Sequence, residues 1–198
     1  AGLALMRDDE LFSPRLIDRP RTVGAVRQSL AEGLGFVRRT PVVLLAVTVM
    51  GLVATFGMNF SVVVPPLAED VLHSGAIGYG FLMTAGGLGA TIAAISLAMS
   101  GQPRPARIAI GAIVLGVALI ALAVSSSYAI SLICMLFAGG GGIAMSATAN
   151  ATIQLAVPDG LRGRVMSVYT TVFSASMPAG GLLMGSLASA VGIAEAIA

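Results

Sequence analysis

The sequence of 198 residues contains no tryptophan and no lysine, and it has only one cysteine and one histidine. Cys134 cannot form a disulfide within the chain, and His73 has only Glu69 and Asp70 nearby, instead of the clustered ligands of a metal site. The apolar segments contain no nucleophile accompanied by a base or by metal ligands. These absences predict that the protein is not an enzyme and uses neither a metal nor another cofactor.

Charged residues are scarce as well, at 10% of the sequence compared with roughly 25% in soluble domains. All eleven basic residues are arginines, and the formal net charge is +2. Nucleic-acid-binding proteins spread Arg and Lys over one face beside stacking aromatic residues. Here aromatic residues make up only 5% of the sequence, and the arginines lie between apolar runs. The sequence therefore predicts no nucleic-acid partner.

Long uncharged runs fill most of the chain, which is 57% hydrophobic. One charge at the centre of a membrane-spanning helix costs about 2.5 to 3.5 kcal/mol, so such runs are typical of spans. Each run is long enough to cross most or all of a hydrocarbon core of roughly 30 Å at about 1.5 Å per residue. The pattern predicts an all-α polytopic membrane helix bundle with five spans, at about 41–64, 77–99, 108–124, 129–156 and 165–190.

The segments outside these spans suggest that the sequence is part of a longer membrane protein. Residues 1–6 are apolar and end in Arg7, as expected for the end of a preceding transmembrane helix. Residues 7–40 form a polar linker, in which apolar residues at spacings of three and four predict an amphipathic helix. That helix lies either in the membrane interface or in solvent as a plain linker. The transmembrane bundle comprises 41–198, and its last residues begin a truncated sixth span.

The arginines predict the orientation of the spans. Seven lie within 7–40, two within 100–107 and two within 158–164, whereas the connections at 65–75 and 125–128 have none. By the positive-inside rule, the segments that contain arginine face the cytoplasm. Asp159, Arg162 and Arg164 are the only charged residues between the fourth and fifth spans, and we predict that they form a cytoplasmic loop or gate.

Polar residues recur on particular faces of three spans. Ser146, Asn150 and Gln154 repeat every four residues in the fourth span, so they share one face of a helix. Such a row either lines a cavity or forms hydrogen bonds between helices. We include it among the candidate cavity residues, which are Met58, Asn59, Ser146, Asn150, Gln154, Tyr169, Thr170 and Ser174. The third span has no polar side chain, which predicts a peripheral position facing lipid.

Two further features concern the mechanism. Pro178, Gly180 and Gly181 predict a bend in the fifth span, because proline removes a helical hydrogen bond and glycine adds backbone freedom. No Asp, Glu, Lys, Arg or His lies inside a predicted span, although such residues mark proton relays. If transport is coupled to protons, this segment does not provide the proton carrier.

Four motifs resemble one family: AEGLGFVRRTP, VVVPPLAEDVL, GFLMTAGGLGATIAA and PDGLRGRVMSVY. Together they are similar to the C-terminal half of a major facilitator superfamily transporter of the bacterial drug and siderophore efflux branch. The resemblance implies half of a twelve-helix fold, with the first, fourth and fifth spans lining a cavity shared with an N-terminal half. It also implies a protein of the bacterial inner membrane and an alternating-access mechanism.

The predicted function is secondary active export of small amphipathic molecules, as in drug efflux by proton antiport. One alternative is a dedicated exporter of a metabolite such as a siderophore. A cluster of fixed polar or charged contacts would favour that alternative. A membrane scaffold that transports nothing is the alternative from another class. The expected partners are the lipid bilayer, a small-molecule substrate and the N-terminal half of the same transporter.

Overall fold

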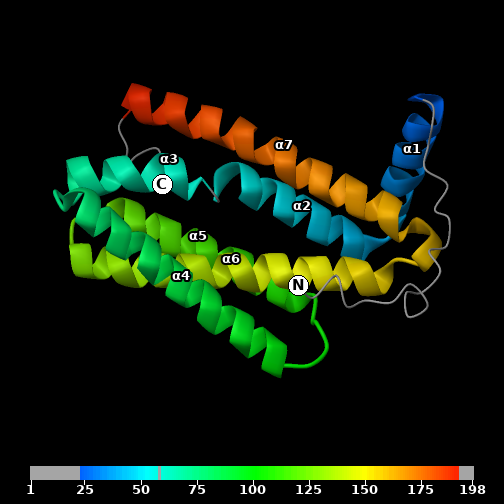
Figure 1. Ribbon diagram of the computed structural model, residues 1–198, viewed down its shortest axis with the longest axis horizontal. Helices are drawn as coiled ribbons and strands as arrows, with labels where there is room; N and C mark the ends of the chain where they lie inside the picture. Colours follow the sequence, from blue (N-terminus) through cyan, green and yellow to red (C-terminus); the bar gives the residue numbers. More distant parts are fainter. Residues whose placement is uncertain (1–22, 58, 192–198) are drawn as a thin grey trace, which may run out of the picture.

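The computed structural model describes residues 23–57 and 59–191, and within these ranges every regular element is helical (Figure 1). The predicted all-α helix bundle is therefore confirmed. The predicted end of a preceding helix at 1–6, the first part of the linker and the truncated sixth span lie outside the described residues. In order, the elements are α1 (Val23–Arg39), α2 (Pro41–Phe56), α3 (Phe60–Pro66), a π-helical turn η3 (Leu67–Val71), α4 (Gly75–Met99), α5 (Ala106–Val124), α6 (Tyr128–Ala156) and α7 (Asp159–Val191).

Helix α6 lies at the centre, and both α4 and α5 pack along it. Glycines bring the α4 and α6 backbones together. A Cβ atom at Gly89 would overlap the carbonyl oxygen of Leu136, and one at Gly139 would overlap that of Gly86. Small residues permit this close approach of helices in a membrane, where apolar burial alone does not drive helices together.

Helices α2 and α7 pack against each other and against α6. Their shared core includes Val43 and Met50 from α2, Met145 from α6, and Val165 and Tyr169 from α7. A second core lies near α3 and joins it to α4, α5 and α6 through residues such as Leu67, Leu82, Leu122 and Met135. These two cores fix the relative positions of the helices around the site described below.

Helix α1 bends away from α2 by 106° at Thr40, which precedes a proline at the first position of α2. Its expected apolar stripe is only partly covered, because Val37 is buried whereas Leu30 and Leu34 are 43% and 41% exposed. Gly33 lies against α7, where a Cβ atom would come within 2.9 Å of the carbonyl oxygen of Arg164. The predicted helix therefore exists and docks on α7, and its place in the membrane interface stays a prediction.

The structure interrupts the helix within the first predicted span, 41–64. Helix α2 ends at Phe56, and α3 begins only at Phe60. The buried side chain of Asn59 donates a hydrogen bond from Nδ2 to the carbonyl oxygen of Thr55 at 2.8 Å, which satisfies a carbonyl freed by the break.

Beyond the break, helix continues into the region predicted as the outer loop 65–75. Pro65 and Pro66 end α3, and the chain then widens into the π-helical turn η3. Proline lacks an N–H donor, and a π-helical turn accommodates such an interruption. The loop therefore shrinks to the few residues between Val71 and Gly75.

The predicted loop at 158–164 is also mostly helical. Helix α6 ends at Ala156 and α7 begins at Asp159, so only Val157 and Pro158 connect them. Pro158 cannot continue α6, and the carboxylate of Asp159 suits the positive end of the α7 dipole. The three charged candidates of this region therefore lie on the first two turns of α7.

Three described helices, α4, α5 and α6, are long and apolar enough to cross a membrane, or four if the bent pair α1 and α2 counts as one span. Helix α2 alone is too short because of the break after Phe56. Helix α7 is longer than α4, α5 and α6 but is not among these candidate spans within the described residues. The number of five spans thus stays a prediction.

The arginine-bearing helix ends of α1 and α7 lie at one end of the bundle. Figure 1 shows α1, the end of α6 and the start of α7 at the right, and α3, η3 and the start of α4 at the left. The arginines of α1 and of α7 lie at the first end, and the arginine-free connections lie at the other (Figure 1). This arrangement agrees with the alternation of loops that the sequence predicts.

Candidate functional site

A groove of about 620 Å³ lies between α2, α6 and α7. Its lining includes four of the eight candidate cavity residues, Ser146, Asn150, Gln154 and Tyr169. The groove is made by the three helices that correspond to the first, fourth and fifth predicted spans. The other lining residues are Met50, Ala147, Ala151 and Phe173.

The polar wall of the groove is the row on α6. Gln154 Nε2 donates a hydrogen bond to Asn150 Oδ1, and Ser146 Oγ donates to the carbonyl oxygen of Ile143 at 3.4 Å. Both bonds stay within α6, so these side chains form no described hydrogen bond to α2 or α7. Neutral amide and hydroxyl groups therefore line the groove without joining two helices.

The facing wall is apolar and aromatic. Tyr169 and Phe173 come from α7, and Met50 comes from α2. Aromatic and thioether side chains offer polarisable surface that adapts to varied ligands. A mostly apolar wall with a few polar groups is the usual composition of a small-molecule site.

Two candidates on α7 lie away from the groove. Thr170 and Ser174 are exposed and are absent from its lining. Thr170 Oγ1 donates to the carbonyl oxygen of Met166 at 2.9 Å, a bond within its own helix. With Ser167 and Thr171, which are also exposed, these residues form a hydroxyl row on the face of α7 opposite its packed residues.

The two candidates from the first span are not in the groove either. Met58 lies outside the described residues. Asn59 is buried at the break between α2 and α3, where it lines a separate cavity of about 20 Å³ with Phe60 and Leu119. Its amide caps Thr55, so the structure gives Asn59 a role in holding the break.

The three charged candidates form two different ion pairs. Arg162 contacts Asp159 at 2.8 Å, and both side chains are well exposed, at 47% and 78%. This pair spans one turn of α7 and fixes no other helix. Arg164 pairs with Glu32 of α1 and so connects α7 to the linker helix.

The pairing of Arg164 was not predicted, although one signal was available. Glu32 is the only acidic residue of α1. Glu32 stands beside a glycine on the helix that precedes the first span, and Arg164 stands at the start of the last described span. This combination could have indicated a contact between the two helices. Finding it required knowing that α1 folds back on α7.

The proline and glycine candidates lie near the other end of α7. The helix runs from Asp159 to Val191 through Pro178, so the expected bend produces no break. Gly180 instead permits close packing, because a Cβ atom there would overlap the carbonyl oxygen of Thr55 and approach Asn59 Nδ2 to 2.6 Å. Gly181 lies beside the side chain of Asn59. This glycine pair therefore packs on the break in the first span.

Sequence reasoning missed four groove residues: Met50, Phe173, Ala147 and Ala151. The two alanines accompany the polar row at a spacing of four, which is a usable signal.

The hydroxyl groups of Thr148 and Thr152 on α6 are buried and have no hydrogen-bond partner in the described structure. The structure places no group of three His, Cys, Asp or Glu side chains within its described ranges that could hold a metal ion.

Comparison with known proteins shows the relationships of the chain. A family model described as "transmembrane secretion effector" matches residues 9–198. The multidrug efflux pump Tap of Mycolicibacterium fortuitum is 30% identical over 181 residues, covering 89% of this chain. The chain spans 43% of the length of that relative. No solved structure matches it significantly.

Proposed function

Because the chain belongs to the transmembrane secretion effector family of the major facilitator superfamily, we propose that it forms the C-terminal half of an efflux transporter. The cargo is a small amphipathic molecule, and transport proceeds by alternating access in a bacterial inner membrane. The name of the relative, a multidrug efflux pump, supports this direction and cargo. The length of the match, 43% of that relative, supports the presence of a partner half.

One observation carries the proposal: the row of Ser146, Asn150 and Gln154 faces a groove instead of a neighbouring helix. The alternative interpretation, hydrogen bonding between helices, would require bonds from this row to α2 or α7. The bonds of the row stay within α6. Helix packing uses other faces of α6, where glycines and the buried hydroxyl residues lie.

The groove composition favours an adaptable site over a dedicated one. Its lining has amide, hydroxyl, phenol, thioether and aromatic groups and no formal charge. A strongly anionic cargo would lose its hydration there without gaining a charged partner, which is costly. A weakly polar molecule, or a cation with delocalised charge, avoids that cost and gains contact with Tyr169 and Phe173. This composition supports drug-like cargo more than a charged siderophore.

We further propose that the N-terminal half completes the cavity and contacts the hydroxyl row of α7 that includes Thr170 and Ser174. That half would also supply the proton-carrying carboxylate, because the lining of the groove has no side chain that titrates near neutral pH. At the arginine-bearing end, the pair of Glu32 and Arg164 would make α1 move with α7 when the halves rock.

The experiment compares Asn150→Trp with Ile113→Trp in the full-length transporter. Energised inside-out vesicles accumulate ethidium, and dye transport and membrane abundance are both measured. Asn150→Trp should abolish accumulation at normal abundance, because the indole fills the groove. Ile113 is exposed on α5 outside the groove, so Ile113→Trp should transport normally. Equal transport by both variants would show that the row on α6 only packs.

A further inference from the structure

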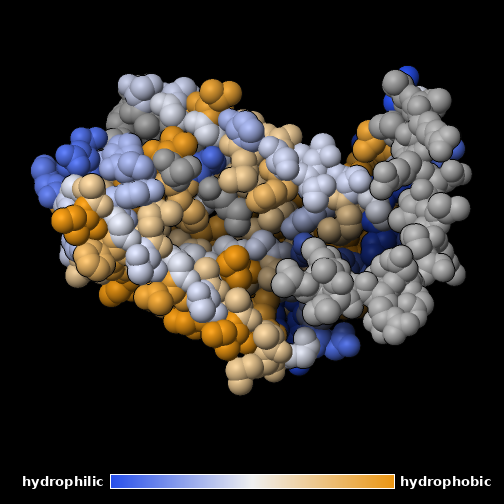
Figure 2. Space-filling view, in the orientation of Figure 1, coloured by the Kyte–Doolittle hydropathy of each residue, from blue (hydrophilic) through white to orange (hydrophobic). Residues whose placement is uncertain are grey.

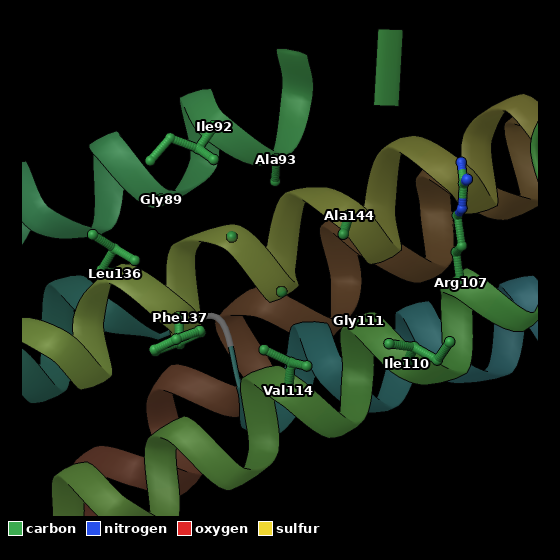
Figure 3. Close-up of a pocket in the computed structure, with 12 residues that line it drawn as sticks. Gly89, Ile92, Ala93, Arg107, Ile110, Gly111, Val114, Leu136, Phe137 and Ala144 are labelled. Carbon is green, nitrogen blue, oxygen red and sulfur yellow. The ribbon is translucent and has the colours of Figure 1, made fainter. Parts of the chain in front are cut away.

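A second groove, of about 260 Å³, lies on another side of α6, between α4 and α5 (Figure 3). It exists because α4 and α5 each pack on α6 while their backbones stay apart from each other. Glycines at both crossings bring the helices close, so few side chains fill the space between them. Ile92, Ile110 and Phe137 border the groove and are more than half exposed.

The lining of this groove is apolar except for one residue, Arg107. Figure 3 shows Arg107 at one end, with Ile110 and Val114 following along α5, and Leu136 and Gly89 at the far end. Seven residues of α5 separate Arg107 from Val114, a rise of about 10 Å. The surface of the groove itself is apolar, so the aliphatic stem of Arg107 lines its end and the guanidinium lies just beyond it (Figure 3).

Arg107 is placed to receive an anion. The first turn of α5 contains no acidic residue, and no acidic side chain within the described ranges pairs with Arg107. The backbone N–H groups of Arg107 and Ile108 already donate to the carbonyl oxygens of Arg104 and Pro105, at 2.9 and 3.0 Å. Among the described residues the guanidinium is therefore the group available to an anion, and it offers paired donors of the kind that bind phosphate.

We propose that this groove binds an anionic phospholipid of the cytoplasmic leaflet. The headgroup phosphate contacts Arg107, and one acyl chain lies along Ile110, Val114 and Phe137. The orientation fits a bilayer, because Arg107 lies in a connection predicted to be cytoplasmic and the apolar part extends toward the membrane interior. The groove is smaller than the roughly 300 to 1,000 Å³ of sites for drug-sized ligands, and it lacks their orienting polar groups. This proposal rests on neither the cargo nor the direction of transport.

The first test measures binding of phosphatidylglycerol and phosphatidylcholine to the full-length protein by native mass spectrometry. Arg107→Gln should weaken phosphatidylglycerol binding about fivefold, the effect of one arginine near an anionic surface. Arg104→Gln removes the same charge three residues earlier, before α5, but leaves the groove lining intact, so it should bind as the unaltered protein does. Equal losses in both variants, or equal affinity of the unaltered protein for both lipids, would overturn the proposal.

The second test examines the acyl chain. Ala144→Leu narrows the groove and should weaken phosphatidylglycerol binding, whereas Ala109→Leu, on an exposed face of α5, should not. Should a variant fail to fold, the unaltered protein gives the answer through a phosphatidylglycerol with a diazirine in its acyl chain. Its crosslinks should map to Ile92, Ile110 and Phe137 in preference to Ile113. Crosslinks that favour Ile113, or spread evenly over the apolar surface, would refute a specific groove.

Discussion

Arg162 and Arg164 stand two residues apart on α7, yet their contacts have different consequences. The Arg162 pair with Asp159 lies within one helix and is largely exposed, and such pairs contribute about 0.3 to 0.5 kcal/mol. The Arg164 pair with Glu32 joins two residues that are 132 positions apart in the sequence and lie on different helices. Its side chains are 42% and 39% exposed, so its energy is modest, and it adds to the packing of Gly33 and Val37 that docks α1 on α7.

A double-mutant cycle tests the docking role of Arg164. Glu32→Ala and Arg164→Ala should each speed amide hydrogen exchange in α1 about twofold, equivalent to about 0.5 kcal/mol. The double variant should be no faster than either single variant, because both remove one interaction. Asp159→Ala is the matched control at the same helix end and should leave α1 unchanged. Additive effects of Glu32→Ala and Arg164→Ala would mean that the pair does not couple α1 to α7.

The candidate site was predictable where polar residues have a helical period. A spacing of four placed Ser146, Asn150 and Gln154 on one face, and the structure puts that face in a groove. Met50 and Phe173 were not predictable, because apolar residues in an apolar span do not reveal which side faces a cavity. Asn59 was a cavity candidate as part of a polar cluster in the first span, and the structure shows its side chain bonded to the carbonyl of Thr55 at the break.

At the scale of elements, the break between α2 and α3 meets the glycine pair of α7. Asn59 holds the break through Thr55, and Gly180 packs against the same carbonyl. The missing side chain at Gly180 is therefore a condition for α7 to lie against the end of α2. This contact lies at the end of the bundle remote from Arg164.

Substitution of Gly180 should separate these helices. Gly180→Leu introduces a side chain where even a Cβ atom overlaps backbone, and such overpacking costs about 1 to 3 kcal/mol. Gly185→Leu is the matched control, because a Cβ atom there meets nothing within 4 Å in the same helix. The thermal unfolding temperature of the purified full-length protein should fall for Gly180→Leu and not for Gly185→Leu. Similar temperatures for both variants would argue against close packing at Gly180.

The uncharged runs at 77–99, 108–124 and 129–156 predicted α4, α5 and α6 within a few residues, because length and apolarity determine such helices. The break at Gly57 was not predictable by hydropathy, since a single polar residue, Asn59, does not interrupt an otherwise uncharged run. The extent of α7 was misjudged at its start because charged residues suggested a loop. Asp159, Arg162 and Arg164 are compatible with an exposed helical turn, and hydropathy alone does not separate the two.

For the whole molecule, the distribution of arginines predicts which end of the bundle is cytoplasmic. Figure 2 shows hydrophilic residues toward the two ends of the bundle and a hydrophobic lower face formed largely by α4. Apolar side chains such as Ile92, Ile95 and Met99 are exposed along that helix, as expected for contact with lipid or with another bundle.

Cysteine labelling tests this topology in the full-length protein after Cys134→Ala and removal of any other cysteine. Gln102 and Ser126 are exposed in the connections before and after α5, so Gln102→Cys and Ser126→Cys create accessible thiols. An impermeant maleimide should label Ser126→Cys in intact cells and Gln102→Cys only in inside-out vesicles. Labelling of both from one side would contradict the predicted orientation.

The residues of the proposed partner half cannot be predicted from the sequence of this chain. The chain spans 43% of the length of its relative. It provides the wall of the groove that α2, α6 and α7 form. In the proposed transporter, the residues that complete the cavity, and any carboxylate that carries a proton, would come from the partner half. Periodicity within these 198 residues could predict the row that faces the cavity but not what lies across from it.

The claim that this groove is half of a substrate cavity is tested most directly by the water accessibility of Asn150. In the full-length transporter without other cysteines, Asn150→Cys and Ile113→Cys are treated with a charged methanethiosulfonate in proteoliposomes. A thiol must be in contact with water to form the reactive thiolate. Our account predicts rapid modification of Asn150→Cys that ethidium slows, and no modification of Ile113→Cys. Equal inertness at both positions, or modification of Asn150→Cys that ethidium does not slow, would contradict it.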